Sequence, residues 1–393
     1  MPEPSDNAHI LRAATWALRA QFLFAGALFA TWGVQVPSIK AAYGLGEQLL
    51  AIAMLATGAG SVFALLHAGR VLAHRAPRQL LPGLALVSVA AIGNLLTATH
   101  YALLLALMLA YGIAAALLDV AINDEATSLE RATGRHLMSG FHGMFSLGGM
   151  LGAGAWSLLA SAGVRPIEHL VGACVALGLL ALGASRFMLQ QNRTPHPEGP
   201  KLSLPRGPLA LLGLLAAVGL IAEGAMYDWS VLYMRQEIDV PPAQASLAYA
   251  SFSLAMAAGR FAGDGVRARV APVALLRASG ALGALGMVLA LAVPHPNAAL
   301  AGFALVGLGF SNVVPVLFSA AGQLPGVAPA HAIAAVSSVG YFGMMVGPPL
   351  IGFIAQASSL ALGLTVVVGF AAMVGALAQR ALGPLDPSPA PRA

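Results

Sequence analysis

Two acidic side chains lie inside a long apolar stretch of the chain, where water is scarce. An ionisable group in hydrocarbon costs several kcal/mol unless it is paired, hydrated or neutralised. Glu223 lies 15 residues after Pro208, so it would sit roughly 22 Å along a helix that rises about 1.5 Å per residue. Burial there favours the neutral carboxyl, which lets the group bind and release a proton. Glu223 is therefore predicted to carry a proton or to contact a ligand; the alternative is a protonated acid held by a neighbouring helix.

Asp228 is the second acid, one helical turn beyond Gly224. Tyr227 shares the face of Glu223, because residues four apart are neighbours on a helix. Trp229 could form a flat apolar wall for a sugar ring, and Asp228 could accept its hydroxyls or pair with an ammonium group. The alternative is that Trp229 belongs to an interfacial aromatic belt, with Asp228 hydrated beside it.

A second polar group lies in two consecutive apolar runs of the first half. Asp119 and Asn123 are four residues apart on one run, and His142 and Ser146 are four apart on the next. Asp119 and His142 both lie about one to two turns from the loop that joins the runs, so they could touch. Histidine titrates near physiological pH, so such a contact could act as a gate or a proton relay. The alternative is a constitutive polar clamp, and in either case Asp119 should not face lipid.

Uncharged polar residues in other runs could hydrogen-bond a hydroxylated ligand. Serines also serve as packing contacts between membrane helices, which is the alternative interpretation for Ser338. The other candidates of this kind are Trp32, Gln35, Asn312 and Tyr341.

The composition requires a second apolar phase around these residues. Hydrophobic residues make up 58% of the chain of 393 and charged residues only 9%, whereas about a quarter of a soluble domain is charged. This surplus exceeds what a water-soluble core could enclose, so it must face lipid. The single cysteine excludes a disulfide scaffold and a cysteine-bound metal domain, and no cofactor or metal is expected. The charges lie in short connections, which indicates membrane topology and argues against a nucleic-acid partner.

Twelve runs are long enough to cross a bilayer, whose core of about 30 Å takes roughly 20 apolar residues of helix. The runs are residues 15–37, 47–69, 79–98, 101–123, 136–161, 167–189, 208–234, 243–265, 271–293, 297–321, 330–354 and 358–382. The chain is thus predicted to be an all-α membrane protein with twelve transmembrane helices.

The segment 190–207 differs from every other connection, because it is polar and contains four prolines that prevent a regular helix. It predicts an N-terminal six-helix bundle (1–190), a cytoplasmic linker (191–207) and a C-terminal six-helix bundle (208–393). Weak internal sequence similarity supports a duplication, since residues 148–152 match residues 343–347 at an offset of 195. Two parallel six-helix pseudo-repeats are the architecture of many secondary transporters.

Lys and Arg are expected to concentrate on the cytoplasmic side of a membrane protein. With the N-terminus inside, all but three of the 20 Lys and Arg residues lie in or beside cytoplasmic segments; the exceptions are Lys40, Arg165 and Arg235. An even number of spans puts both ends on one side. Both termini are therefore predicted to be cytoplasmic, in a bacterial-type inner (plasma) membrane.

A basic loop follows the second predicted span. Its sequence, Gly69-Arg-Val-Leu-Ala-His-Arg-Ala-Pro-Arg78, is similar to the G-x-L-A-D-R-x-G-R-R signature of the major facilitator superfamily, with Ala73 in place of the acid and Ala76 in place of the second glycine. Twelve spans in two halves and this loop resemble that family over nearly the whole chain. The resemblance implies the major facilitator fold and alternating access to a central cavity.

Three segments resemble one branch of the family. Residues 119–123, 139–146 and 223–229 look like the MosC-like branch, which is distantly similar to fucose permeases. For the namesake of this branch, the resemblance suggests rhizopine-type amino-inositols as substrates.

Gating is assigned to three charged residues near the predicted cytoplasmic ends. Arg70 begins the basic loop, and Arg260 and Asp264, four residues apart, could lock the second half. The alternative for that pair is a solvated surface contact, and such contacts are weak. This topology places no Lys or Arg deep in a span, so nothing would neutralise an anionic substrate at the midplane.

The chain is therefore predicted to be a secondary active transporter of a small polar solute, which would be a sugar, a polyol, or an amino-sugar or inositol-like molecule. Protons would be coupled through Glu223, Asp119 and His142. The alternative is a proton-driven exporter of amphipathic or cationic drug-like compounds. Catalytic motifs such as HExxH and GxSxG do not occur, so an enzyme is not expected. The predicted partners are the solute, protons and the lipid bilayer, and the sequence sets no oligomeric state and is compatible with a monomer.

Overall fold

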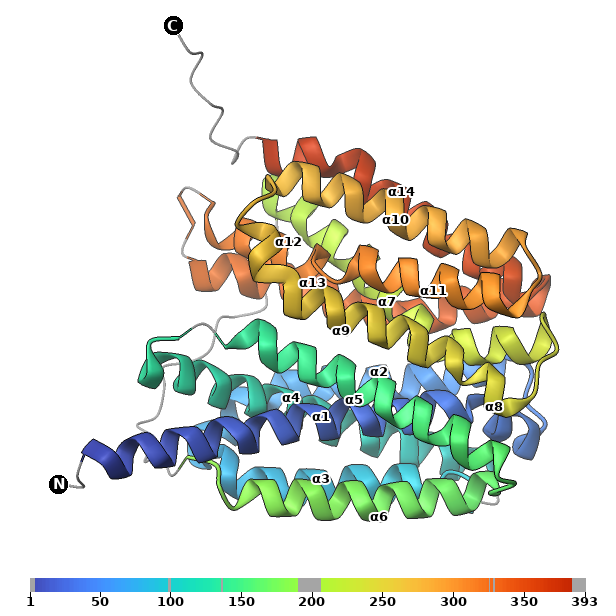
Figure 1. The fold of residues 1–393 in the computed structure, drawn as a ribbon, viewed down its shortest axis with the longest axis horizontal. Helices are drawn as coiled ribbons and strands as arrows, with labels where there is room; N and C mark the ends of the chain where they lie inside the picture. The colour runs from blue at the N-terminus through green and yellow to red at the C-terminus, as the bar shows by residue number, and fades with distance from the viewer. Residues whose placement is uncertain are drawn as a thin grey trace, which may run out of the picture.

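The computed structural model describes residues 4–97, 100–135, 137–189, 206–324, 326–327 and 329–383. Every regular element among them is a helix (Figure 1). The helices are α1 Pro4–Tyr43, α2 Glu47–His74, α3 Pro77–Gly93, α4 Tyr101–Thr133, α5 Met138–Ser161, α6 Pro166–Ser185, α7 Pro208–Gln236, α8 Pro242–Ala245, α9 Leu247–Arg267, α10 Pro272–Ala292, α11 Pro296–Phe310, α12 Val313–Gly322, α13 Pro329–Ala357 and α14 Leu360–Leu382.

These helices form the twelve predicted spans. Ten spans are long and apolar enough to cross a membrane, with α11 and α12 counted as one span that is interrupted at Ser311 and Asn312. The apolar α3, of 17 residues, and α9, of 21 residues, complete the set, and α8 is a single turn before α9. Most of the predicted linker, residues 191–205, lies outside the described residues.

Two helices extend well beyond the apolar runs that predicted them. α1 begins at Pro4, and α4 continues to Thr133 through a polar stretch. The extension of α4 ends at Gly134, whose φ of 64° is left-handed and whose backbone N–H donates to the carbonyl of Glu130. Glycine closes a helix in this conformation at no steric cost, so the end of α4 follows from the glycine and not from hydropathy.

The helices pack in the same order in both halves. In the first half α1 packs on α5 and α6, α2 packs on α4, and α3 packs on α4 and α6. In the second half α7 packs on α13 and α14, α9 packs on α11, and α10 packs on α11 and α14. The equivalent spans therefore make equivalent contacts, as the pseudo-repeat predicts.

Close approach of backbones is built into these contacts. A Cβ added to Gly112 of α4 would lie 2.0 Å from the carbonyl oxygen of Thr57 on α2. Small residues let membrane helices approach in this way, and dispersion contacts then hold them together.

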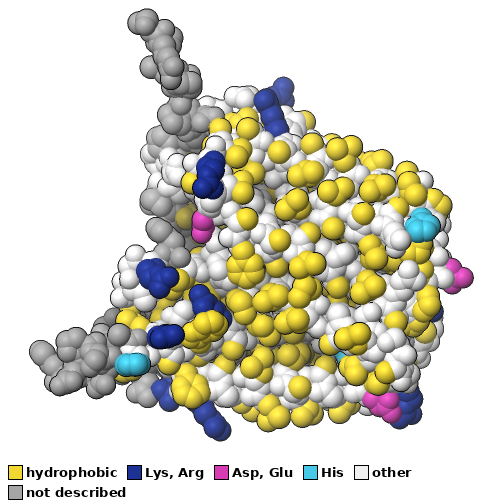
Figure 2. All heavy atoms as spheres, viewed as in Figure 1, with side chains coloured by type: hydrophobic (Ala, Val, Ile, Leu, Met, Phe, Trp, Pro, Cys, Tyr) yellow, Lys and Arg dark blue, Asp and Glu magenta, His cyan; other side chains and the backbone are white. Residues whose placement is uncertain are grey.

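The halves meet chiefly where α5 packs on α9, α2 packs on α13 and α1 packs on α7. α1 begins and α14 ends at the same end of the bundle, which we call the terminal end; the opposite end is the distal end (Figure 1). Figure 2 shows hydrophobic side chains covering the flank between the two ends, with most Lys and Arg at the terminal end. A flank of this kind is suited to contact with lipid.

Candidate functional site

A buried ion pair lies where the two halves meet. Nη2 of Arg260 on α9 is 2.8 Å from Oε1 of Glu223 on α7, and both side chains are largely enclosed. Glu223 is 15 residues from the first residue of α7 and 13 from the last, so it lies near the middle of that helix. Tyr227, one turn further on, directs its hydroxyl toward the same carboxylate oxygen at 3.3 Å.

Arg260 also reaches the other half of the molecule. Its Nη1 donates to Oγ of Ser146 on α5 at 2.8 Å, and Ser146 is fully buried. One guanidinium thus connects an acid of its own half to a hydroxyl of the opposite half. Arginine is suited to this role because its five N–H groups form a fixed fork that stays charged.

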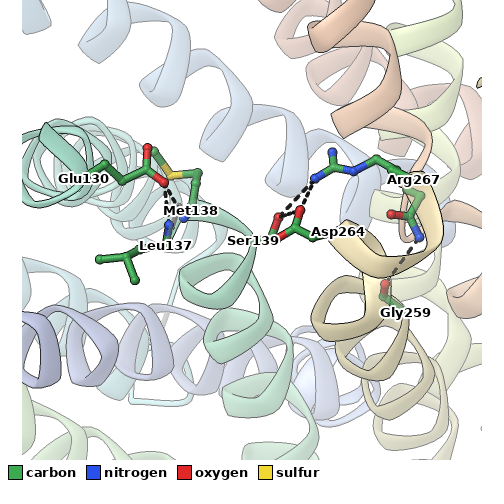
Figure 3. Close-up of polar contacts among 8 residues, drawn as sticks. Glu130, Leu137, Met138, Ser139, Gly259, Asp264 and Arg267 are labelled. Carbon is green, nitrogen blue, oxygen red and sulfur yellow. Dashed lines mark hydrogen bonds and ion pairs between the residues drawn. The ribbon is translucent and has the colours of Figure 1, made fainter. Parts of the chain in front are cut away.

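The predicted role of Arg260 as a partner of Asp264 is wrong. Asp264 pairs with Arg267 instead, and Ser139 of α5 donates to its Oδ1 at 3.0 Å (Figure 3). Arg260 lies seven residues before Arg267, about 10 Å further into the span. Arg260 thus lies inside a span, and the prediction that no Lys or Arg lies deep in a span is wrong.

Asp228 forms a second contact between the halves. The indole Nε1 of Trp32 on α1 donates to Oδ1 of Asp228 at 3.4 Å, and both side chains are buried. Among the described residues no Lys, Arg or His forms an ion pair with Asp228. A buried carboxylate in this position can bind a proton or a cationic or hydroxylated ligand.

Aromatic rings enclose Tyr227 on several sides. Phe29 and Phe145 approach it from the first half with ring centroids 5.3 Å and 6.4 Å away. Tyr249 and Phe252 of α9 approach from the second half at 5.1 Å and 5.0 Å. These distances suit offset and edge-to-face contacts between rings.

Two further polar atoms at this centre were missed by the sequence analysis. The hydroxyls of Tyr249 and Ser253 are buried, and neither has a hydrogen-bond partner among the described residues. Both side chains lie next to Gly149 of α5, where an added Cβ would be 3.0 Å from Oγ of Ser253. Buried hydroxyls without partners are suited to a ligand that supplies the missing bonds. No pattern singled them out, because Tyr249 and Ser253 lie in a helix with many small and polar residues.

The predicted contact between Asp119 and His142 is not formed. Asp119 instead accepts a hydrogen bond from Nδ2 of Asn123, 3.1 Å away on the next turn of α4. The described part of the chain contains no hydrogen bond or ion pair between Asp119 and His142. His142 packs edge-on against Phe22, at a centroid distance of 5.4 Å, and lies within electrostatic range of Arg260.

Two predicted binding residues point away from the centre. Nε2 of Gln35 lies 2.9 Å from Nδ1 of His169, inside the first half. Trp229 is fully buried, and its ring packs toward Gly352 of α13, so it belongs neither to an exposed belt nor to the central cluster.

The remaining candidates are dispersed. Asn312 donates to the backbone carbonyl of Gly259 at 3.3 Å, and Ser338 donates to a carbonyl of its own helix. Tyr341 of α13 lies within electrostatic range of Asp119 and remains partly exposed. Arg70 is exposed near the terminal end of α2.

Polar contacts link the two halves at the distal end. Lys40 and Glu47 form an ion pair at 2.9 Å, and Nε2 of Gln236 on α7 donates to Glu47 at 3.2 Å. The backbone N–H of Gln48 donates to Oε1 of Gln356 at 3.4 Å. These contacts hold α2 against α7 and α13 at that end.

No group of three or more His, Cys, Asp or Glu side chains close enough to hold a metal ion occurs among the described residues.

Comparison with known proteins places this architecture in a family. Residues 17–327 match the profile of the Major Facilitator Superfamily. The chain belongs to the major facilitator superfamily. It is therefore a multi-pass membrane transporter of the secondary type and not an enzyme, as the sequence predicted.

Three bacterial members of the superfamily are similar in sequence over most of the chain. An uncharacterized MFS-type transporter of Yersinia pestis is 37% identical, covering 87% of this chain and 89% of the relative. The membrane protein MosC of Rhizobium meliloti is 31% identical over 91% of this chain and 88% of MosC. An uncharacterized transporter of Sinorhizobium fredii is 33% identical over 91% and 96%. The predicted resemblance to MosC is thus confirmed.

Two solved structures share the fold. A bacterial homolog of the human lysosomal transporter Spinster, in an inward-facing and unoccupied conformation, matches with a TM-score of 0.71 at 15% identity, over 99% of this chain and 100% of that one. The same homolog in an inward-facing and occupied conformation matches with a TM-score of 0.68.

Proposed function

We propose that this transporter moves a small polar solute by alternating access and couples that movement to protons. The observation that carries the proposal is the buried link from Glu223 through Arg260 to Ser146. A charged group at the contact between the halves can control the equilibrium between their two arrangements. A proton or ligand that neutralises the charge shifts this equilibrium if it binds one arrangement better than the other.

The proton would act on the carboxylate of Glu223. Protonation removes its negative charge and weakens its pairing with Arg260, which lies 2.8 Å away. Arg260 would then redistribute its hydrogen bonds between Ser146 and a bound solute. Proton binding and solute binding would thus act on the same guanidinium, which is a direct form of coupling.

Polar groups around Asp228 support a hydroxylated or amine-bearing solute. Asp228 has no basic partner among the described residues, and the hydroxyls of Tyr249 and Ser253 lack hydrogen-bond partners there. Trp32 presents an indole N–H on the opposite half. A sugar, a polyol, or an amino-sugar or inositol-like molecule could satisfy these groups together, and an amine would also balance the charge of Asp228.

The aromatic cluster favours a second candidate. Phe29, Phe145, Tyr227, Tyr249 and Phe252 surround the same centre. Rings of this kind attract flat or cationic compounds through dispersion and cation–π contacts. Proton-driven export of an amphipathic or cationic compound would use this cluster, with Asp228 as the counter-charge.

The orientation follows the distribution of basic residues. We place the terminal end, with both termini, in the cytoplasm of a bacterial-type cell. The polar contacts of Glu47 and Gln48 then link the halves on the outer side, and those of Ser139 with Asp264 and Arg267 link them on the cytoplasmic side.

A thermal-shift screen of the purified protein against polyols, hexoses, amino sugars, inositols and hydrophobic cations tests the proposal, because a ligand that binds the folded state stabilises it. Stabilisation by a polar solute that is lost in Asp228→Asn supports the proposed function. Asp239→Asn is the matched control, since Asp239 is exposed and its φ of 57° suits asparagine. Stabilisation by hydrophobic cations alone would contradict the polar-solute proposal and favour export.

A further inference from the structure

A groove at the terminal end lies outside the central cluster. It has a volume of about 590 Å³ and lies between the first turns of α1 and the connection from α4 to α5. Its lining combines three arginines, an exposed tryptophan and small or apolar residues. Arg12, Trp16 and Arg19 line it from α1, and Arg135 and Leu137 line it from the connection.

The groove is positively charged, and no acidic side chain that the structure describes pairs with its arginines. Arg12, Arg19 and Arg135 form no ion pair with any residue whose side chain is described. Glu130 is the acid bonded to the groove's lining residue Leu137, and its Oε1 accepts the backbone N–H groups of Leu137 at 2.6 Å and Met138 at 2.9 Å (Figure 3). The three guanidinium groups therefore keep their N–H donors for an external anion.

Trp16 marks the level of the membrane surface. Its side chain is 59% exposed, and the guanidinium of Arg19 lies over its ring at 4.5 Å from the centroid. Trp16 precedes Lys40 by 24 residues on the same helix, a rise of roughly 36 Å. That length places the two residues in opposite headgroup regions of a bilayer whose full thickness is about 40–45 Å. Tryptophan is enriched at that level because its ring is apolar and its N–H is polar.

We propose that this groove binds the phosphate headgroup of an anionic phospholipid from the leaflet at the terminal end. Arginine recognises phosphate through paired N–H donors, and basic pockets between membrane helices bind anionic headgroups. Figure 2 shows Lys and Arg gathered at this end beside the hydrophobic flank, so a lipid could place its headgroup in the groove and its acyl chains against the flank. Trp16 would lie beside the glycerol region.

Trp16 also provides the probe for this site. The chain has four tryptophans, and the other three, Trp32, Trp156 and Trp229, are at most 2% exposed. Lipids brominated near the top of their acyl chains quench tryptophans that they touch. The full-length protein is reconstituted in phosphatidylcholine with increasing fractions of brominated phosphatidylglycerol, or of brominated phosphatidylcholine as the neutral reference.

Brominated phosphatidylglycerol is expected to quench the fluorescence of Trp16 at a several-fold lower mole fraction than brominated phosphatidylcholine does. Arg12→Gln, Arg19→Gln and Arg135→Gln combined should abolish that preference, and the same positions changed to Lys should retain part of it. The matched control combines Arg75→Gln, Arg78→Gln and Arg269→Gln, which removes the same charge elsewhere at the terminal end and should keep the preference.

Two results would overturn the proposal. One is equal quenching by both lipids in the unchanged protein. The other is an equal loss of preference in the groove variant and the control variant, which would mean general attraction to a basic surface. Inorganic phosphate at low millimolar concentration distinguishes a free anion from a lipid. It should leave the quenching of Trp16 unchanged, and restoration of the Trp16 signal would mean that the groove prefers a soluble anion to the lipid headgroup, which would overturn the proposal.

Discussion

Nη1 of Arg260 on α9 lies 2.8 Å from Oγ of Ser146 on α5, so a charged hydrogen bond spans the two halves of the transporter. The same guanidinium holds Glu223 at 2.8 Å. Because one group makes both contacts, a change at the acid is transmitted to the contact between the halves.

Neutralising either member of the buried pair should destabilise the protein. Glu223→Gln or Arg260→Gln leaves the other charge without a partner, which typically costs about 3–5 kcal/mol. The double variant removes both charges, so its melting temperature should lie above that of either single variant. The measurement is thermal unfolding in detergent, with Glu168→Gln, in an exposed pair with Arg165, as the control. A double variant less stable than both single variants would contradict the pairing.

Removing the hydroxyl of Ser146 should favour opening of the distal end. Ser146→Ala loses a hydrogen bond to a charged group, worth about 1.5–3 kcal/mol, and a shift of about 1.4 kcal/mol changes a population ratio tenfold. A cysteine at Ala51 reports opening, because Ala51 of α2 is fully buried against Gly352 of α13. Maleimide labelling there should rise about tenfold, and the native Cys174 is buried and adds little background.

The control for that experiment is Ser88→Ala, since Ser88 is buried and its hydroxyl bonds only to a carbonyl of its own helix. It should leave the labelling rate unchanged. Equal labelling in Ser146→Ala and in the unchanged protein would mean that the bond does not bias the two arrangements.

Removing the indole N–H of Trp32 should weaken solute binding. Trp32→Phe keeps the ring but removes the N–H that donates to Asp228 at 3.4 Å. Asp228 then loses its hydrogen bond from the first half, and we expect weaker binding by about threefold to tenfold, in line with one hydrogen bond. Titration calorimetry with the solute found in the thermal-shift screen measures the dissociation constant. An unchanged dissociation constant would exclude Trp32 from the binding site.

Glycine at position 112 should be irreplaceable for packing. A Cβ there would lie 2.0 Å from the carbonyl oxygen of Thr57, a distance that requires the backbones of α2 and α4 to separate. Gly112→Ala should lower the melting temperature by several degrees. Gly154→Ala in α5 is the matched control, because nothing lies within 4 Å of the added Cβ and alanine is the better helix former. Equal melting temperatures would contradict the close approach.

Most of the fold could be predicted from hydropathy alone. Helix ends agreed with the apolar runs within a few residues for most spans, because lipid demands continuous apolar helix. The exceptions lie outside the apolar region, where α1 begins at Pro4 and α4 runs on to Gly134. There the ends follow from local capping and packing, which periodicity does not report.

The site was predicted only in part. Glu223, Tyr227, Asp228 and Trp32 meet at the centre, since isolated polar residues in apolar helices must find partners there. Arg260 was predicted to lie near a cytoplasmic end, because it is only five residues before the end of the apolar run 243–265. The helix continues to Arg267, so Arg260 lies two turns inside it.

Other misassignments arose from rotation about the helix axis. Gln35 and Trp229 lie on helices that line the centre but face neighbouring helices instead. Which face of an almost wholly apolar helix points inward is set by packing with other helices, and a single sequence does not contain that information.

Proton-driven uptake into proteoliposomes tests the central claim most directly. The protein is reconstituted, a pH gradient is imposed, and accumulation of the solute identified by thermal shift is compared between the unchanged protein, Glu223→Gln and Glu168→Gln. We predict that Glu223→Gln loses accumulation but still exchanges solute in counterflow, while Glu168→Gln does both. Full accumulation by Glu223→Gln under the same gradient would contradict proton coupling through Glu223 and Arg260.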